Sequence, residues 1–202
     1  MHLRANMFSI EPGRLDELIR HIEEQVLPVV KEQRGNRGLA MDVDRTSGQC
    51  AIVTFWDGAD AMRSTDARLS ALHDRIHENY GAPSEVIEAE VLGMHVRQQP
   101  MPGCWNRVSM IELASDDIDV AVETFNTSTL PGLDAMDGFC AALLCGVREH
   151  GRAVAVTTWR DREALQASTE RANALREEAR DKTHGKIASV MELEVVIATM
   201  TS

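Results

Sequence analysis

The hydrophobic positions of the chain change their spacing in one order, and that order occurs twice. Apolar residues first alternate, as in a strand, and then recur at helical spacing. Each half predicts a strand, a helix, two further strands, a second helix and a final strand. The predicted strands are residues 3–10, 38–44, 50–56 and 85–96 in the first half and 106–113, 138–145, 153–159 and 189–199 in the second.

Matching residues at a constant separation indicate that the two halves are copies of one unit. Trp56 and Trp159 lie 103 positions apart (159 − 56), and Leu27-Pro28 has the same separation from Leu130-Pro131. Proline disfavours helical geometry at the residue before it. Each copy is therefore predicted to kink or restart its first helix at this pair.

Both faces of the first predicted strand are mostly apolar. Asn6 and Phe8 fall on one face, and Ala5 and Met7 fall on the other. Helices on one side of an antiparallel sheet would normally leave its other face polar, so something must cover this apolar one, and the simplest cover is the same face of the second copy of the unit. The predicted fold class is α+β, with tandem duplicated ferredoxin-like units forming an intramolecular dimeric α+β barrel. The predicted units are residues 1–97 and 105–202, joined by a Pro/Gly-rich linker at 98–104.

Composition restricts the partners and the location. Of the 202 residues, 32 are acidic and 21 basic, which gives a net charge of −11. That balance argues against nucleic acid and against a membrane surface as the main partner. No apolar run is long enough to span a bilayer and no signal peptide is evident, so we expect a cytoplasmic protein. The four cysteines form no CxxC pair and are interpreted as reduced structural residues.

With this order of elements the chain resembles the antibiotic biosynthesis monooxygenase superfamily, whose members are dimeric α+β barrels. The resemblance rests on the element order, the Leu-Pro helix break, and the third strand that ends in Trp, VTFW and VTTW. It covers almost the whole chain and implies two such units fused in tandem. The superfamily includes oxygenases, a haem-degrading branch, isomerases and members without known activity, so the resemblance implies the fold more firmly than the chemistry.

The haem-degrading branch of that superfamily provides the sharpest comparison for site residues. It carries an Asn on the first strand and an iron-ligating His on the second helix, and Asn6 and His73 match those two places. The branch also expects a Trp on the second helix, where this chain has Arg63-Ser64-Thr65. The second copy has Ser109 in place of Asn6 and Arg176 at about the place of His73, so any such site would be single.

The residues themselves give the same two candidates. Asn6 shares its strand face with Phe8 and should point into the layer between sheet and helices, either as a core amide or as a donor lining a pocket. His73 falls at the edge of the apolar stripe of its helix and should face the same layer, as a boundary residue, a base or a ligand. His73 and His77 form HxxxH, but no third metal ligand is evident and His77 should lie toward solvent.

Two other repeated features have simpler interpretations. Trp56 and Trp159 occur in both copies and are interpreted as core residues. Alternating carboxylates on the last strands could serve acid–base catalysis, but their alternation favours a solvated strand face; these are Glu88, Glu90, Glu192 and Glu194.

Two functions follow as hypotheses. The first is a monooxygenase that acts on a planar aromatic or quinone-like molecule bound in the first repeat. In members that need no metal, the resemblance implies that a substrate carbanion reacts with O2. Asn6 would donate to a substrate oxygen, and His73 would act as the base without a cofactor, or as the iron ligand if haem is bound. The second is a non-catalytic binding module for a small apolar or aromatic molecule. In both, the chain is an intramolecular pseudo-dimer, and further homodimerisation is left open.

Overall fold

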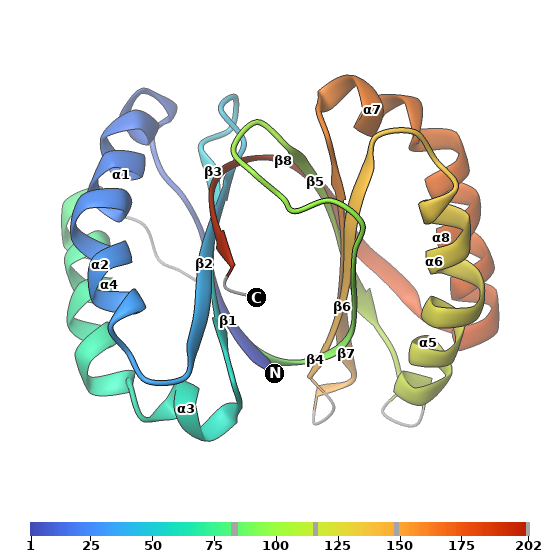
Figure 1. The fold of residues 1–202 in the computed structure, drawn as a ribbon, viewed down its shortest axis with the longest axis horizontal. Coiled ribbons are helices and arrows are strands. Elements are labelled where there is room, and N and C mark those ends of the chain that lie inside the picture. The colour runs from blue at the N-terminus through green and yellow to red at the C-terminus, as the bar shows by residue number, and fades with distance from the viewer. Residues whose placement is uncertain (82–84, 115–116, 148–149, 201–202) are drawn as a thin grey trace. The chain divides into compact units, whose positions relative to one another are not determined.

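The computed structural model describes residues 1–81, 85–114, 117–147 and 150–200, and it contains every strand predicted from the sequence (Figure 1). The strands are β1 (His2–Ser9), β2 (Asn36–Val43), β3 (Gln49–Trp56), β4 (Glu85–Val96), β5 (Trp105–Glu112), β6 (Phe139–Val147), β7 (Arg152–Trp159) and β8 (Lys186–Met200). The helices are α1 (Leu15–His21), α2 (Leu27–Lys31), α3 (Ala59–Arg63), α4 (Asp66–Tyr80), α5 (Ile118–Thr124), α6 (Leu130–Asp134), α7 (Arg162–Ala167) and α8 (Thr169–Thr183). A short 3₁₀ turn, Pro12–Arg14, precedes α1.

The chain divides into two compact units. Unit 1 consists of residues 1–89 and 194–202, and unit 2 consists of residues 90–193. All strand pairs within the units are antiparallel. Unit 1 has the order β1-β3-β2 followed by the C-terminal part of β8, and unit 2 has β5-β7-β6 followed by the C-terminal part of β4. An α+β protein built from two ferredoxin-like units is therefore confirmed.

The compact units differ from the sequence repeats at one strand each. In unit 1, β2 pairs with the end of β8, from Val43 opposite Glu194 to Gly38 opposite Met200. In unit 2, β6 pairs with the end of β4, from Gly146 opposite Glu90 to Ala141 opposite Val96. The predicted boundaries, 1–97 and 105–202, therefore follow the repeats, whereas the strand pairing places the end of each repeat's last strand in the unit of the other repeat.

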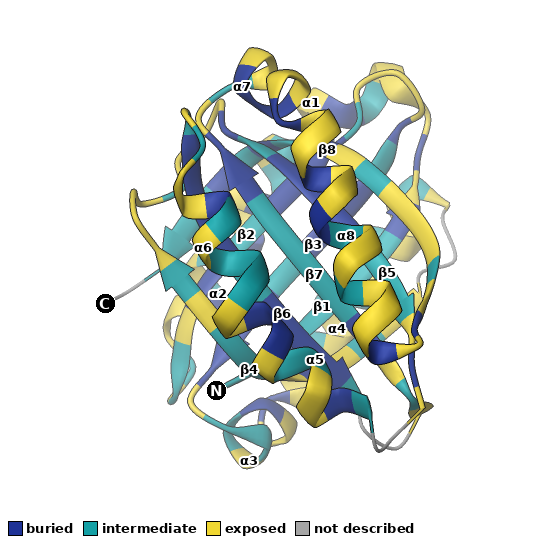
Figure 2. Ribbon diagram, turned by 90° about the vertical axis from the view of Figure 1, so that its right-hand side faces the viewer, coloured by how far each residue is buried: buried dark blue, intermediate teal, exposed yellow. Residues whose placement is uncertain are grey.

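The core of unit 1 lies between its sheet and helices α1, α2 and α4 (Figure 1). Leu15, Leu18, Ile22 and Val26 recur at helical spacing and are all buried, because one stripe of the helix faces the sheet. Leu39 and the other apolar residues of β2 complete this core from the sheet side. Unit 2 repeats the layer: Figure 2 shows α8 with an exposed outer face above strands whose residues are coloured as buried or intermediate.

The helix break predicted at each Leu-Pro pair is confirmed. The residues before Leu27 form a π-helical turn, Ile22–Val26, and α2 restarts with Pro28 in its first turn. The second copy has the same arrangement, with the π-helical turn Phe125–Thr129 before Leu130. Proline has no N–H to donate to the preceding turn, so a wider turn or a restart is required at this point.

A hairpin turn joins β2 to β3 at Gly48. This residue has φ = 77°, and a Cβ added there would lie 1.9 Å from the carbonyl oxygen of Ile10. The Ile10 N–H donates to the Gly48 carbonyl at 3.0 Å, which ties the hairpin to the end of β1. Only glycine allows this close approach.

Among the helices in the described residues, none is long and apolar enough to cross a membrane.

Candidate functional site

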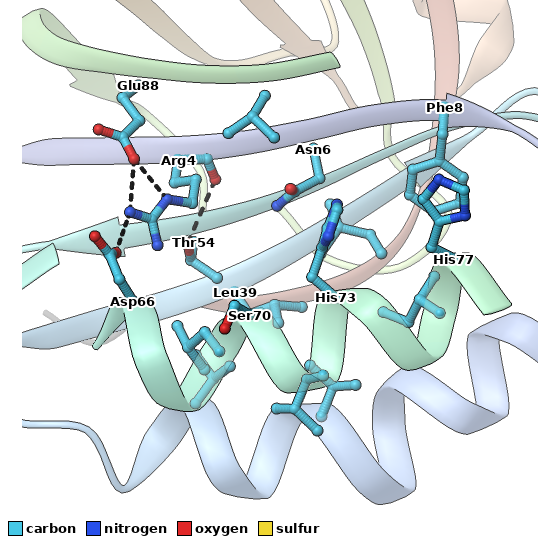
Figure 3. A pocket seen from close by; sticks show the side chains of 17 residues that line it. Arg4, Asn6, Phe8, Leu39, Thr54, Asp66, Ser70, His73, His77 and Glu88 are labelled. Carbon is cyan, nitrogen blue, oxygen red and sulfur yellow. Dashed lines mark hydrogen bonds and ion pairs between the residues drawn. The ribbon is translucent and has the colours of Figure 1, made fainter. Parts of the chain in front are cut away.

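A cavity of about 280 Å³ lies in unit 1 between strand β1 and helix α4 (Figure 3). Its volume is close to the lower end of small-molecule sites, which is about 300 Å³. Apolar side chains form most of its wall, and polar groups enter from β1, β4 and α4. The lining residues include Arg4, Asn6, Phe8, Leu39, Ile52, Thr54, Asp66, Leu69, Ser70, His73, Ile76, His77, Val86 and Glu88.

Asn6 and His73, the two residues predicted from the sequence, both line this cavity. Asn6 points from the helix-facing side of β1, and His73 projects from α4 toward the same space (Figure 3). Within the described part of the chain, the Asn6 amide makes no hydrogen bond, although its side chain is partly buried. His73 Nδ1 lies 3.8 Å from Asp74 Oδ1. The cavity therefore contains an amide whose hydrogen-bonding capacity is open to a ligand.

Arg4 brings charge to one end of the cavity. Its guanidinium donates to Asp66 Oδ1 at 2.5 Å and to Glu88 Oε1 at 2.6 and 2.9 Å, and its side chain is 13% exposed. Burial on its own would lower the pKa of Arg4, but the hydrogen bonds to the two carboxylates outweigh it and raise the pKa above its ordinary value. The Arg4 cluster, defined as Arg4, Asp66 and Glu88, is thus a fixed polar end wall with one net negative charge.

The Arg4 cluster was not predicted from the sequence, whose alternating carboxylates indicated a solvated strand face for Glu88. The structure agrees with the exposure of Glu88 and Glu192, and it adds that Glu88, Glu192 and Glu194 each accept a hydrogen bond from an arginine. A signal was present: Arg4 recurs as Arg107, and Glu88 recurs as Glu192 one position later than the offset of the arginines. The repeat of a charged residue on a mostly apolar strand face indicates that each arginine has a partner, but it does not specify which side chain that partner is.

Unit 2 contains a smaller counterpart of the cavity, of about 80 Å³. Ser109 takes the place of Asn6, and Arg176 takes the place of His73. The buried Arg107 is satisfied by the chain itself, through Glu192 Oε1, the Leu165 carbonyl and two hydroxyl groups. The two units therefore share a fold but present different chemistry at equivalent positions.

His77 is exposed, as expected, and it also lines the cavity of unit 1 together with His73 and Asn6. No group of three or more His, Cys, Asp and Glu side chains among the described residues is arranged to hold a metal ion. The HxxxH spacing therefore supplies two imidazoles to the wall of the cavity.

The repeated tryptophans are core residues, as the sequence indicated. Trp56 and Trp159 are fully buried, and each indole N–H donates at 3.0 Å to the threonine two positions before it. The four cysteines, Cys50, Cys104, Cys140 and Cys145, are buried free thiols. Burial raises the pKa of Cys50 and of Cys145 to about 12, which keeps both thiols protonated and unreactive.

Comparison with known sequences gives relatives without an assigned activity. No family model matches the chain. The uncharacterized proteins Rv2557 and Rv2558 of Mycobacterium tuberculosis are each 28% identical to it, over 198 and 201 residues. Both alignments cover 98% of this chain, with 88% of the first relative and 84% of the second.

Solved structures similar to this chain share its fold at low sequence identity. A candidate monooxygenase from Fusobacterium nucleatum has a TM-score of 0.73 and 14% identity, covering 100% of this chain and 94% of its own. An anthrone oxidase-like protein has a TM-score of 0.70 and 17% identity, with 97% and 92% covered. A Listeria monocytogenes ferredoxin-fold protein related to antibiotic biosynthesis monooxygenases has a TM-score of 0.52 and 7% identity, with 96% and 95% covered.

Proposed function

We propose that this chain, which has the fold of the antibiotic biosynthesis monooxygenase superfamily, is a monooxygenase that binds a planar aromatic or quinone-like molecule in the cavity of unit 1. The observation that carries the proposal is the open amide of Asn6 in a mostly apolar cavity that it shares with His73. A ligand with one oxygen atom on an aromatic ring system would satisfy that amide and bury its rings against Leu69 and Ile76.

Size and polarity support a ligand of one to three fused rings. The cavity is small, and its few polar groups are set among mostly apolar lining residues. The Arg4 cluster closes one end with net negative charge, which disfavours an anionic group there. The oxygen of the ligand is therefore expected at Asn6, with the apolar edge directed away from the Arg4 cluster.

Asn6 and His73 would have distinct roles. His73 would accept a proton from an activated C–H group of the substrate, and the Asn6 amide N–H would donate to the substrate oxygen on which the negative charge develops. The carbanion then reduces O2: at a CH₂ group, one oxygen atom becomes a carbonyl oxygen and the other leaves as water with the two hydrogens.

Haem, the alternative ligand, fits this cavity poorly. A volume of about 280 Å³ is too small for the macrocycle. The tryptophan that the haem-degrading branch expects is replaced by Arg63 and Ser64, which are exposed, and by Thr65, whose hydroxyl donates to the Met62 carbonyl at 2.7 Å. We therefore assign no step of the reaction to haem, and His73 is proposed as a base.

The test is O2 uptake by the whole chain with a panel of hydroxyquinones and anthrones. Removal of one oxyanion donor costs about 10²–10³ in kcat, so Asn6→Ala should lower turnover by a factor in that range. The matched control is Ser109→Ala, the equivalent position of unit 2, which should leave turnover unchanged. His73→Gln should also lower turnover.

Each other outcome contradicts a part of the proposal. Saturable ligand binding without O2 uptake would indicate the non-catalytic binding module. Saturable haemin binding that is lost in His73→Ala would indicate the iron branch. Equal losses of turnover in Asn6→Ala and Ser109→Ala would show that the active site is not confined to unit 1.

A further inference from the structure

The smaller cavity of unit 2 carries a pair of arginines at the positions where unit 1 carries its two histidines. Arg176 and Arg180 lie 103 positions after His73 and His77, and both arginines line this cavity. The rest of the wall is mostly apolar, with Leu113, Phe125 and Leu144 among its residues. The two cavities are therefore lined at equivalent positions by imidazoles in unit 1 and by guanidinium groups in unit 2, and the guanidinium groups stay charged at all physiological pH values.

Arg180 is exposed and already has a carboxylate partner, Asp181 Oδ1, at 2.9 Å. Arg176 differs in both respects. It is partly buried, and its hydrogen bond goes to the amide oxygen of Asn173, a neutral group. Within the described part of the chain, Arg176 forms no ion pair.

The surroundings of Arg176 disfavour the positive charge of its guanidinium. Burial lowers the pKa of its guanidinium, and the neighbouring Arg107 lowers it further, against an opposing effect of Glu192. Glu192 Oε1, however, accepts hydrogen bonds from both Nε and Nη2 of Arg107. The Glu192 carboxylate is thus hydrogen-bonded to Arg107 and not to Arg176, and an anion in the cavity would supply Arg176 with a partner of opposite charge.

We propose that the cavity of unit 2 binds a short-chain aliphatic carboxylate, with its carboxylate on Arg176 and its hydrocarbon part among Leu113, Phe125 and Leu144. The planar fork of a guanidinium matches the two oxygens of a carboxylate. The cavity of about 80 Å³ has room for on the order of half a dozen water-sized groups, which excludes the ring systems proposed for unit 1. An apolar wall favours an alkyl carboxylate over inorganic phosphate, because phosphate would bury polar oxygens without donors.

This site is independent of the function proposed for unit 1 and is tested by calorimetric titration of the whole chain. The ligands are butyrate, 1-butanol as its uncharged analogue, and inorganic phosphate. Butyrate should bind saturably, 1-butanol should bind at least tenfold more weakly, and phosphate should not bind. A hydrogen-bonded charge contributes about 1.5–3 kcal/mol, so Arg176→Gln should weaken butyrate binding by about tenfold to a hundredfold.

Two matched variants separate the site from a general charge effect. Arg171→Gln removes an exposed arginine of the same helix that does not line the cavity, and it should bind butyrate as the parent chain does. Arg176→Lys keeps the charge and should retain part of the affinity. Undiminished butyrate binding by a folded Arg176→Gln variant, or equal binding of butyrate and 1-butanol, would overturn the proposal. Absence of saturable butyrate binding would overturn it as well.

Discussion

At the scale of single residues, the two units compensate the charge of an equivalent strand arginine with different partners. A strand arginine faces the helix layer in each, Arg4 in unit 1 and Arg107 in unit 2. Arg4 is held by two side-chain carboxylates at the edge of the open cavity. Arg107 is 2% exposed and is held by one carboxylate, a carbonyl and two hydroxyl groups. The tighter enclosure of Arg107 accompanies the smaller cavity of unit 2.

We expect Arg107→Met to destabilise the chain by about 3 kcal/mol, at the lower end of the range for breaking a buried ion pair. The Leu165 carbonyl, which also accepts from the Ser168 hydroxyl, and the Ser168 oxygen would each lose the hydrogen bond from Arg107, whereas Glu192, whose side chain is 42% exposed, could regain water. Urea denaturation measures the change in the free energy of unfolding.

The matched control for this prediction is Arg45→Met, which removes an arginine with an exposed ion pair. Arg45 is 48% exposed and contacts Glu194 and Asp16. Surface pairs contribute about 0–1 kcal/mol, so this variant should remain close to the parent chain. Equal effects of the two substitutions would show that burial of Arg107 does not determine its contribution.

The placement of Asn6 and His73 could be predicted from the sequence, and that of the Arg4 cluster could not. The alternation of a strand fixes the face of Asn6, and the helical wheel fixes the face of His73, so both faces follow from local spacing. Arg4 shares the face of Asn6, but its partners Asp66 and Glu88 lie 62 and 84 positions away. Their meeting depends on how α4 and β4 pack, which spacing does not specify.

At the scale of elements, the hairpin between β2 and β3 is held by Asp44. The Thr46 N–H donates to Asp44 Oδ1 at 2.9 Å, and the Ser47 hydroxyl donates to Oδ2 at 2.6 Å. The hydrogen bond from Ser47, followed by that from the Thr46 backbone, lowers the pKa of Asp44 below its ordinary value. The ionised carboxylate is therefore the form that the folded hairpin favours.

This pKa shift predicts that Asp44 stabilises the fold in a pH-dependent way. A carboxyl group whose pKa is lower in the folded chain contributes its stabilisation above the unfolded pKa of about 3.9, and loses it as the pH falls through the folded pKa. The free energy of unfolding of Asp44→Ala should therefore differ from that of the parent chain more at about pH 7 than at about pH 2. Urea denaturation at both pH values measures this, with Asp60→Ala, at an exposed carboxylate, as the control. A difference independent of pH would contradict the role of the charge.

The interrupted first helix shows what an element-level pattern can predict. Leu27-Pro28 and its copy predict a break, because the proline restriction is local. The sequence did not predict that the break takes the form of a π-helical turn before each pair. That form depends on keeping both Ile22 and Val26 in the buried stripe, and hence on the core they pack against.

At the scale of the whole molecule, the exchange of last strands makes the two repeats dependent on each other. The repeat pattern predicts four strands in each half, but it does not specify which sheet the end of the last strand joins. Unit 1 needs residues 194–200 to pair with β2, and unit 2 needs residues 90–96 to pair with β6. Without them, the N–H and C=O groups along one side of β2 or β6 would lack partners.

We therefore expect the isolated repeat 1–97 not to form a stable monomer. Its β2 edge would be open, and its own residues 90–96 would lack the strand that they pair with in the intact chain. A second copy of the repeat can satisfy both, since the end of its β4 is the equivalent of the end of β8. Light scattering and circular dichroism should find a folded homodimer of 1–97, which converts to a one-to-one complex when 98–202 is added. A folded 1–97 monomer would show that the exchanged strands are dispensable, and that each repeat is a complete folding unit.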